Sequence, residues 1–501
     1  MRKLSLLPFV QNDLLGRILD LLCEEPTAAY VAGGYVRDWL LGRESKDVDL
    51  TVAAPAIPLA RRIADRTGGA FYVLDDEMDA ARIIYKPPDP FEVDLSGLRC
   101  PDILADLRER DFAMNAMAVD LRDCYDENPE VLDPCGGRDD LAAQTLRAAS
   151  EHAFQRDPVR LLRAVRFGVS MGLRIEPATE SWMRRDAALI TLPSAERVRQ
   201  ELVLIFAATG VAGQVRRLDD FGLLSPILPE VSALKGVAQS EPHVDDVYEH
   251  SLATVGEVER LTAANGAQLS ALEREYLGPF SAALDAHLAT ITSEKRSRRT
   301  MLKFAALLHD VGKPMVRSVE PGGRIRFFEH ERNGSTVAAE VLTRLRFSAQ
   351  EAHRAGVIVG NHMRPGLLAK HHSATPRAVY RFFRDCGDTG LDVLLLSLAD
   401  HLATRGPHLL LEHYRDHLEV VRLMLDAYLY QPGEVVSPPS LVTGRDVMEL
   451  LQIPPGPRVG ELLEAVREAQ AEGHVRTPDD AREFLRNYRG PETARNKHGE
   501  H

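Results

Sequence analysis

Hydrophobic and polar residues follow two different periods along this chain. Between residues 30 and 95, short apolar runs alternate with polar positions at strand spacing, while residues 35–41 and 56–67 show helical spacing. From about residue 150 onward, apolar residues recur at helical spacing, interrupted by a hairpin pattern at residues 317–328. The chain is therefore predicted to be an α+β protein with a small α/β head followed by helical domains. Strands are expected at 30–32, 47–52, 70–74, 81–85 and 91–95.

Turns and proline-rich joints divide the chain further. Asp133-Pro134-Cys135-Gly136-Gly137 is expected to close the head, and two proline-rich joints lie within residues 431–439. We expect a head at 1–150 and a helical neck at 151–238. A further helical domain is expected at 239–405 and a helical tail at 406–490, while residues 491–501 are expected to be disordered.

The most informative stretch is Val31-Ala32-Gly33-Gly34-Tyr35-Val36-Arg37-Asp38, followed by Asp47-Val48-Asp49. Gly33 and Gly34 permit a tight turn between a strand and a helix, where backbone N–H groups and Arg37 favour phosphate. Asp47 and Asp49 project from one face of the next strand, and two adjacent carboxylates suit Mg²⁺. A phosphate-binding turn followed by an aspartate pair is what phosphoryl transfer requires.

On these motifs the chain resembles the class II tRNA nucleotidyltransferase and bacterial poly(A) polymerase family, whose head is similar to DNA polymerase beta. Asp94 lies on an alternating strand and is a candidate third catalytic carboxylate, with a solvated strand-edge carboxylate as the alternative. Residues 106–118 alone have the pattern of an amphipathic helix start, but they also resemble the family's second motif. The resemblance implies that Arg110 contacts the triphosphate and that Asp111 and Asn115 bind ribose hydroxyls.

Two residues depart from that second motif. Glu109 stands where the family has arginine, and Ala113 stands where it has threonine. The first change removes a potential phosphate contact.

A helical region opens at residues 154–167, where Pro158 suits an early helical position and Asp157 suits an N-cap. Arg156, Arg160 and Arg163 are spaced to share one helix face, which is either a solvated basic face or a nucleotide-binding one. The resemblance favours the second reading: Asp157 and Arg160 match the family's base-selecting pair, whereas Arg156 replaces its glutamate. An aspartate accepting the exocyclic amine of cytosine or adenine would suit CTP and ATP.

A second set of polar residues lies on the helical background beyond residue 240. It contains His250, the adjacent pair His309 and Asp310, and then His330, His362 and Asp400. This order resembles the HD phosphohydrolase superfamily, whose mixed imidazole and carboxylate ligands hold divalent transition metals. The resemblance implies a primary metal site of His250, His309, Asp310 and Asp400, with His330 and His362 binding a second metal or phosphate and Lys313 neutralising phosphate charge. The basic run at 295–299 is expected to be a solvated face, with RNA contact as the alternative.

Composition limits the remaining possibilities. The hydrophobic share of 45% and charged share of 27% are typical of a soluble globular protein, and no apolar run is long enough to span a membrane. The five cysteines form no CxxC pair, which favours a reducing, cytoplasmic location and argues against a thiolate zinc site. The net charge of −13 predicts a small, localised nucleic-acid footprint.

The expected function is addition of C and A to the tRNA 3′ end from CTP and ATP, through two Mg²⁺ ions held by Asp47, Asp49 and Asp94. The N-termini of helices in the tail are candidate contacts for tRNA phosphates. Poly(A) polymerase, CC-adding and A-adding activities share the same motifs and stay open. An HD phosphohydrolase or RNA-binding regulator with a vestigial head is the alternative of another class. The sequence indicates no obligate protein partner.

Overall fold

The structure is a computed structural model that describes residues 13–43, 45, 47–86, 90–123, 128–294 and 296–488. The chain forms two compact units, one of residues 1–204 and 213–227 and the other of residues 205–212 and 228–501. The expected disordered tail at 491–501 lies outside the described residues. Among the described residues, no helix is long and apolar enough to cross a membrane.

A mixed sheet forms the centre of the first unit. Its strand order is β3-β4-β5-β2-β1-β6, in which β2 and β5 are parallel and the other neighbours are antiparallel. The strands are β1 (Ala29–Ala32), β2 (Asp47–Val52), β3 (Ala70–Asp75), β4 (Ala80–Tyr85), β5 (Phe91–Gly97) and β6 (Ala118–Asp120). The bounds of the predicted strands are confirmed to within about two residues. The prediction succeeds because apolar positions that alternate along a strand are buried on one face.

The parallel pairing of β2 with β5 sets the position of the acidic residues. Asp49 lies opposite Asp94, and Asp47 lies opposite Glu92. The apolar residues that alternate with these acids are buried in the core of the head: Val48, Leu50, Val93 and Leu95. The apolar residues thus fix a register that brings carboxylates from two distant segments together.

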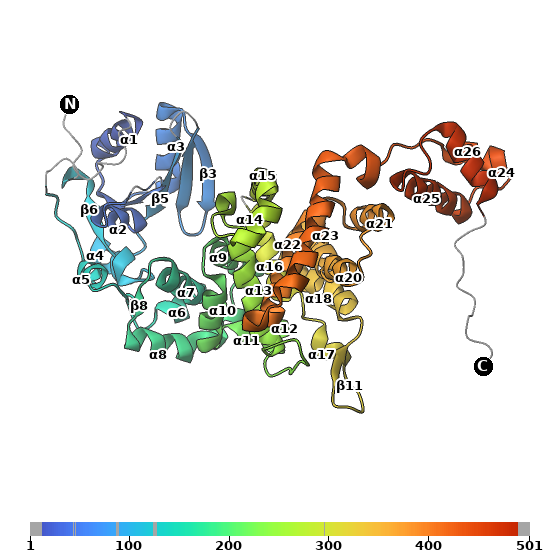
Figure 1. Ribbon diagram of the computed structural model, residues 1–501. Coiled ribbons are helices and arrows are strands. Elements are labelled where there is room, and N and C mark those ends of the chain that lie inside the picture. The colour runs from blue at the N-terminus through green and yellow to red at the C-terminus, as the bar shows by residue number, and fades with distance from the viewer. Residues whose placement is uncertain are drawn as a thin grey trace. The chain divides into compact units, whose positions relative to one another are not determined.

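Helices of the head pack on this sheet. The helix α3 (Ala56–Thr67), whose bounds match the prediction, packs against β4 and β5, and α1 (Asp13–Glu24) packs against α3 (Figure 1). The remaining elements of the head are α2 (Gly34–Leu40), α4 (Ile103–Arg108), η1 (Ala113–Asn115), η2 (Leu121–Asp123), α5 (Gly137–Ala142) and β7 (Thr145–Leu146).

The helical part of the first unit follows. It consists of α6 (Ala153–Arg156), α7 (Arg160–Ser170), β8 (Arg174–Ile175), α8 (Pro177–Asp186), η3 (Ala187–Thr191) and α11 (Leu224–Ile227), with most of α9 (Ala195–Ala207) and α10 (Val211–Asp220), whose residues 205–207 and 211–212 belong to the second unit. The predicted N-cap at Asp157 is wrong in detail. The chain is extended at this residue, α7 begins at Arg160, and its N-cap is Val159. Asp157 still accepts a hydrogen bond from the Val159 amide at 3.2 Å, so it stabilises the turn between the two helices.

The helix start expected from residue 106 is also wrong. The helix α4 ends at Arg108, and Ala113–Asn115 forms a single 3-10 turn. Asp111 explains the break, because its carboxylate accepts hydrogen bonds from the Phe112 amide at 2.8 Å and from Asn115 Nδ2 at 3.2 Å. A short polar side chain that bonds to its local backbone competes with helix formation.

The second unit is mainly helical. The helices α13, α16, α19 and α22 pack on one another, and α18 packs along α19. The predicted hairpin is confirmed as β11 and β12. The elements are α12 (Pro229–Ser232), α13 (Val247–Leu261), η4 (Ala264–Gly266), α14 (Ala271–Leu277), η5 (Gly278–Phe280), α15 (Ser281–Ala289), β9 (Ile291–Ser293), β10 (Arg296–Ser297), α16 (Arg298–Leu308), α17 (Lys313–Val316), β11 (Arg317–Val319), β12 (Ile325–Phe327), α18 (His330–Arg344), α19 (Ala349–Asn361), α20 (Arg364–Lys370), α21 (Pro376–Cys386), η6 (Gly387–Thr389), α22 (Gly390–Arg405), η7 (Gly406–His408), α23 (Leu411–Tyr430), the π-turn η8 (Pro432–Val436), α24 (Gly444–Leu451), α25 (Pro457–Ala471) and α26 (Pro478–Asn487).

The basic run at 295–299 is not a solvated face. Lys295 lies outside the described residues, but Arg296 and Arg298 are buried. Arg296 pairs with Glu351 at 2.8 Å, and Arg298 pairs with Asp388 at 2.9 Å. The prediction fails because acids distant in the sequence pair with these arginines.

Candidate active site of the head and candidate metal centre

The head carries a cavity of about 560 Å³ beside the Gly33-Gly34 bend. Segments from the sheet, from the turn after α4 and from the start of α7 all contribute to its wall. The predicted site residues that line it are Gly33, Gly34, Arg37, Asp49, Asp94, Arg110, Asp111, Asn115, Asp157, Arg160 and Arg163. Asp47 is not among the lining residues and lies at the exposed start of β2.

Gly33 lies between two of the charged groups. Its φ is +76°, and a Cβ atom there would lie 2.9 Å from Arg110 Nη1 and 3.1 Å from Asp49 Oδ2. The next amide, that of Gly34, donates a hydrogen bond to the Asp49 carboxylate. Glycine is therefore favoured at residue 33 by its backbone conformation, and a side chain there would have to displace Arg110 or Asp49.

Burial raises the pKa of Asp49 to about 6, and the nearby carboxylates of Asp94 and Asp47 add to the effect. Arg110 and the Gly34 amide act in the opposite direction. Arg110 and the Gly34 amide thus supply too little positive charge to offset the effects of burial and of the neighbouring acids on the Asp49 carboxylate. A bound cation would supply that charge, so the residues fit a hard divalent ion with oxygen ligands.

Asp94 is held by an arginine that the sequence analysis did not single out. Arg82 Nε and Nη2 donate to the two oxygens of Asp94, each at 2.7 Å. The same guanidinium pairs with Glu92 at 2.7 Å. Arg82 lies opposite Asp94 in the β4–β5 ladder, so this fork depends on strand register.

A polar network continues from the bend to the neck. Arg37 Nη1 donates to Asn115 Oδ1 at 2.9 Å, and Asn115 in turn donates to Asp111. Arg163 donates to Asp111 Oδ2 from Nε at 3.0 Å and from Nη2 at 2.7 Å. Burial would raise the pKa of Asp111, but Arg163, helped by Asn115, holds it below its ordinary value.

The two predicted base-selecting residues lie at the same cavity. Asp157 Oδ2 accepts from Arg197 Nη2 at 2.7 Å, and Arg197 also lines the cavity. Arg160 Nη1 donates to the carbonyl of Arg110 at 3.1 Å and to that of Ala153 at 3.3 Å. The acceptor and the donor are therefore both fixed by neighbouring groups.

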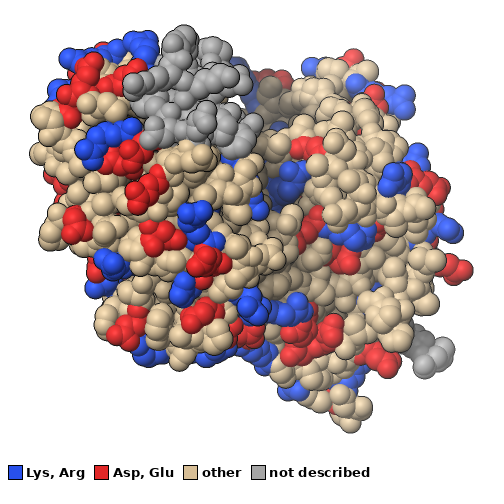
Figure 2. All heavy atoms as spheres, turned by 90° about the vertical axis from the view of Figure 1, so that its left-hand side faces the viewer, with Lys and Arg blue, Asp and Glu red and all other residues tan. Residues whose placement is uncertain are grey.

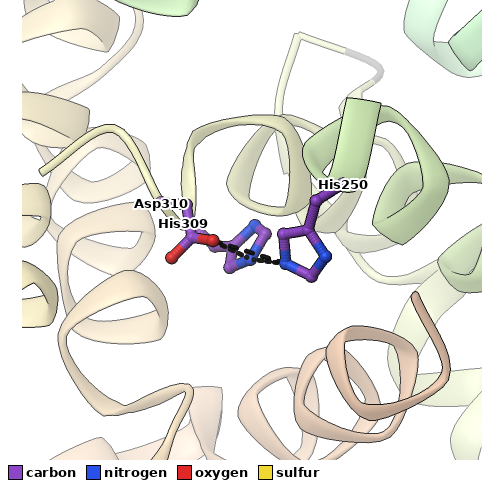
Figure 3. Close-up of side chains that lie close together, drawn as sticks. All are labelled: His250, His309 and Asp310. Atoms are coloured by element: carbon purple, nitrogen blue, oxygen red, sulfur yellow. Dashed lines mark hydrogen bonds and ion pairs between the residues drawn. The ribbon is translucent and has the colours of Figure 1, made fainter. Parts of the chain in front are cut away.

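In the second unit, His250 on α13 faces the pair His309 and Asp310, which follows the end of α16. Figure 3 shows their side chains pointing toward one another. The two Nε2 atoms are 3.1 Å apart, and Asp310 Oδ2 lies 3.3 Å from His250 Nε2 and 3.2 Å from His309 Nε2. All three residues are at most 1% exposed.

The other predicted ligands converge on the same point. Asp400 Oδ1 lies 3.1 Å from His250 Nε2, and His330 Nε2 lies 3.3 Å from Asp310 Oδ1. His362 belongs to two groups of potential ligand atoms, one with His309 and Asp400 and the other with Asp310 and His330. The structure therefore brings together all six predicted residues.

The charges of this cluster are balanced only in part. Burial opposes ionisation, yet the surrounding imidazoles hold the pKa values of Asp310 and Asp400 well below the ordinary value. Despite burial, the two carboxylates raise the pKa of His250 to about 9, whereas burial lowers that of His362 to about 4. Two imidazole nitrogens facing each other beside carboxylate oxygens are a donor set that fits a divalent metal.

Comparison with known proteins supports each part. Residues 29–147 match the family described as the poly A polymerase head domain. Residues 172–235 match a probable RNA- and SrmB-binding site of polymerase A, and residues 247–405 match the HD domain.

Curated relatives cover nearly the whole chain. An A-adding tRNA nucleotidyltransferase of Deinococcus radiodurans is 34% identical over 92% of this chain and 96% of its own length. The chain belongs to the tRNA nucleotidyltransferase and poly(A) polymerase family. A CC-adding tRNA nucleotidyltransferase of Thermus thermophilus is 31% identical over 93% of this chain and 94% of its own length.

Solved structures of CCA-adding enzymes share the fold of this tRNA nucleotidyltransferase family member. The apo form matches with a TM-score of 0.63 at 20% identity, and a complex with CTP matches with a TM-score of 0.61, also at 20% identity. Each match covers 96% of this chain and 96% of that chain.

Charged side chains are arranged differently on one face of the molecule and in the head cavity. Figure 2 shows basic and acidic side chains interspersed over one face of the molecule. The arginines that matter for the head instead line its cavity. The small, localised nucleic-acid footprint expected from the net charge of −13 stays a prediction.

Sequence reasoning missed several residues at both centres. Arg82 and Arg197 hold two of the predicted site carboxylates, and Thr51 accepts a hydrogen bond from Arg110 at 2.9 Å. At the metal centre, the ring of His243 packs edge-on against His250 with centroids 5.4 Å apart. Alternation along β4 was a usable signal for Arg82, because it places that residue on the same face as Asp94.

Proposed function

We propose that the head transfers CMP or AMP units from CTP and ATP to the 3′-hydroxyl of tRNA, with release of pyrophosphate. The observation that supports this most directly is the single cavity that joins the glycine bend, the buried carboxylate of Asp49 and the pair Asp157 and Arg160. Relatives at 34% and 31% identity are named for A addition and CC addition to tRNA.

Each part of the nucleotide has residues suited to it. Asp47, Asp49 and Asp94 would hold Mg²⁺, and Gly33, Gly34, Arg37 and Arg110 would bind the phosphates. Asp111, Asn115 and Arg163 would position the ribose, and Asp157 with Arg160 would select the base. Bound Mg²⁺ would neutralise the triphosphate charge and favour ionisation of the attacking 3′-hydroxyl.

The chain's own groups account for orientation and base choice. The Gly34 amide and Arg110 keep the Asp49 carboxylate directed at the bend. Arg197 fixes one oxygen of Asp157, so the carboxylate presents an acceptor in a defined direction. Cytosine and adenine offer an exocyclic amine to such an acceptor, whereas uracil offers a carbonyl there. The pocket therefore favours CTP and ATP over UTP.

One gel experiment tests this proposal. The protein is incubated with tRNA transcripts that end before CCA, after CC, or after CCA, and with an unrelated RNA, each with labelled CTP or ATP. Addition confined to tRNA supports the proposal, and the extended transcripts identify CC, A or CCA addition. Long A tracts on the unrelated RNA would indicate poly(A) polymerase. No incorporation on any RNA would leave the head vestigial and the proposal refuted.

We also propose a second activity, phosphoester hydrolysis at the His250–Asp310 centre. It is supported by the convergence of six potential ligands and by Lys313, whose Nζ lies 2.6 Å from Asp310 Oδ2. A divalent transition metal held there would lower the pKa of a bound water. Conversion of a 2′,3′-cyclic nucleotide to its monophosphate, or release of phosphate from a 2′- or 3′-monophosphate, with added Ni²⁺ or Mn²⁺ tests it, and neither product with either metal would contradict it.

A further inference from the structure

Three arginines of the neck contact three consecutive residues of the head. Arg156 forms an ion pair with Glu109. Arg160 donates to the Arg110 carbonyl at 3.1 Å, and Arg163 donates to the Asp111 carboxylate at 2.7 Å. Each successive arginine thus contacts the next residue of the segment 109–111.

The contacts differ in what they require of the partner residue. The middle contact uses a backbone carbonyl, so it does not depend on the side chain at residue 110. The contact with Asp111 is largely buried, whereas the Glu109 and Arg156 side chains are 40% and 42% exposed. The outer pair is therefore the one whose residue types can change at least cost.

Glu109 occupies an unusual place for an acid. It lines the cavity that we propose for a nucleoside triphosphate, directly before Arg110. An unpaired carboxylate there would repel the phosphates, because like charges that share a partly desolvated site interact unfavourably. The guanidinium of Arg156 neutralises it, and Arg156 in turn directly precedes Asp157.

We infer that Glu109 and Arg156 form one positioning pair, which ties the phosphate-binding segment to the base-selecting segment and shields the triphosphate from Glu109. This rests on the proposed nucleotide-transfer function of the head. The motifs that the chain resembles have arginine before residue 110 and glutamate before residue 157, whereas this chain has Glu109 and Arg156. Its two charge departures are then one exchange of polarity across a single contact.

A charge-swap cycle tests the pair. The variants are E109R, R156E and the double variant E109R/R156E in the full-length protein. Two readouts are measured for each: equilibrium binding of CTP and ATP, and KM and kcat for nucleotide addition to tRNA. The matched control is R62E, which breaks the ion pair of Arg62 with Glu25 at 2.8 Å in the same unit but away from the cavity. Thermal unfolding checks that every variant is folded.

R156E places two carboxylates together at the cavity, so we expect weaker triphosphate binding and a KM raised by about fivefold, with kcat little changed. The double variant restores the pair with reversed polarity and is expected to return to within about twofold of the wild type, since coupled residues give non-additive effects. The single-variant defect should shrink as ionic strength rises. R62E should leave KM unchanged.

Two results would overturn the inference. One is a single variant R156E that binds triphosphate as the wild type does. The other is a double variant whose defect equals the combined defects of the single variants. If the wild type adds no nucleotide, the proposed function fails by itself, and the binding arm still decides whether the pair positions a triphosphate.

Discussion

The head cavity and the His250–Asp310 centre both gather carboxylates, but in opposite electrostatic settings. In the head, burial raises the pKa of Asp49 to about 6, and Asp94 is held by Arg82. In the helical unit, imidazoles and Lys313 hold the pKa of Asp310 well below its ordinary value, against the effect of burial. In the first site the groups around Asp49 do not offset the effect of burial on its carboxylate, whereas in the second the groups around Asp310 do.

The difference teaches how the two sites relate to what they bind. The head carboxylates are spread over two strands beside an open cavity, so a substrate with its metal can complete the site. In the second centre, the potential ligand atoms of each group lie within 4.8 Å of one another. We therefore expect loss of a carboxylate to affect activity in the first site and the stability of the folded unit in the second.

The largest expected effect is on catalysis in the head. D49N should lower nucleotide addition by about 10³-fold, because a metal-holding carboxylate contributes several kcal/mol to the transition state. Steady-state incorporation on tRNA measures this, and hydrolysis at the second centre should not change. D65N on the exposed face of α3 is the control. Incorporation by D49N at the wild-type rate would remove the basis for a metal at this carboxylate.

The next effect is on the stability of the helical unit. D310N removes the ion-pair partner of Lys313 and leaves His250 with Asp400 as its carboxylate partner, and should lower the free energy of unfolding by about 3–5 kcal/mol. Urea unfolding measures it, with D479N, at a carboxylate whose side chain is 90% exposed, as the control. Equal unfolding midpoints for D310N and D479N would contradict the contrast between the two sites.

In the absence of metal, replacement of Asp49 by asparagine should raise the free energy of unfolding, whereas replacement of Asp310 should lower it. Asp49 has a folded-state pKa of about 6 against an ordinary 3.8, so its contribution to stability is present at low pH and is lost as the pH rises through 6. With chelator present, D49N should therefore stabilise the head by up to about 3 kcal/mol at pH 8 and by little at pH 4. Unfolding monitored at both pH values tests this. A variant less stable than the wild type at pH 8 would refute it.

The smallest effect concerns the bend. G33A adds a Cβ 2.9 Å from Arg110 Nη1, while G42A adds one with nothing within 4 Å, and both residues have positive φ. Both variants should lose about 1 kcal/mol of stability from backbone strain. Only G33A should also lose nucleotide addition, by about tenfold, because its methyl group displaces Arg110 or Asp49. Equal incorporation by the two variants would show that the bend does not position these groups.

Much of the head could be predicted from the sequence because local pattern determines it. The alternation of Val48 and Leu50 with Asp47 and Asp49 sets both the strand and the face of the acids. The buried histidines of the second centre were also predictable from their order along the helices. For the head strands the signal lies within a few residues of the position it predicts, whereas for the second centre it is the order of histidines and aspartates from His250 to Asp400.

The residues whose roles could not be predicted share a physical cause: their partners lie in distant segments of the chain. Arg296 and Arg298 read as a solvated run because Glu351 and Asp388, which pair with them, lie far along the chain. Arg82 meets Asp94 only through the β4–β5 register. Glu109 and Arg156 each look like a defect when considered alone, and only the fold shows them as partners.

The stepwise contacts of Arg156, Arg160 and Arg163 with residues 109–111 have a consequence for how this region can vary. Any insertion or deletion between the first and last arginine would displace every later contact at once, while a change of residue type at the outer pair needs only a matching change opposite. The lengths of these two segments are therefore constrained, whereas the residue types at positions 109 and 156 can change together. Exchange of base preference between relatives should therefore succeed when both short segments are replaced together, and should fail when either segment is replaced alone.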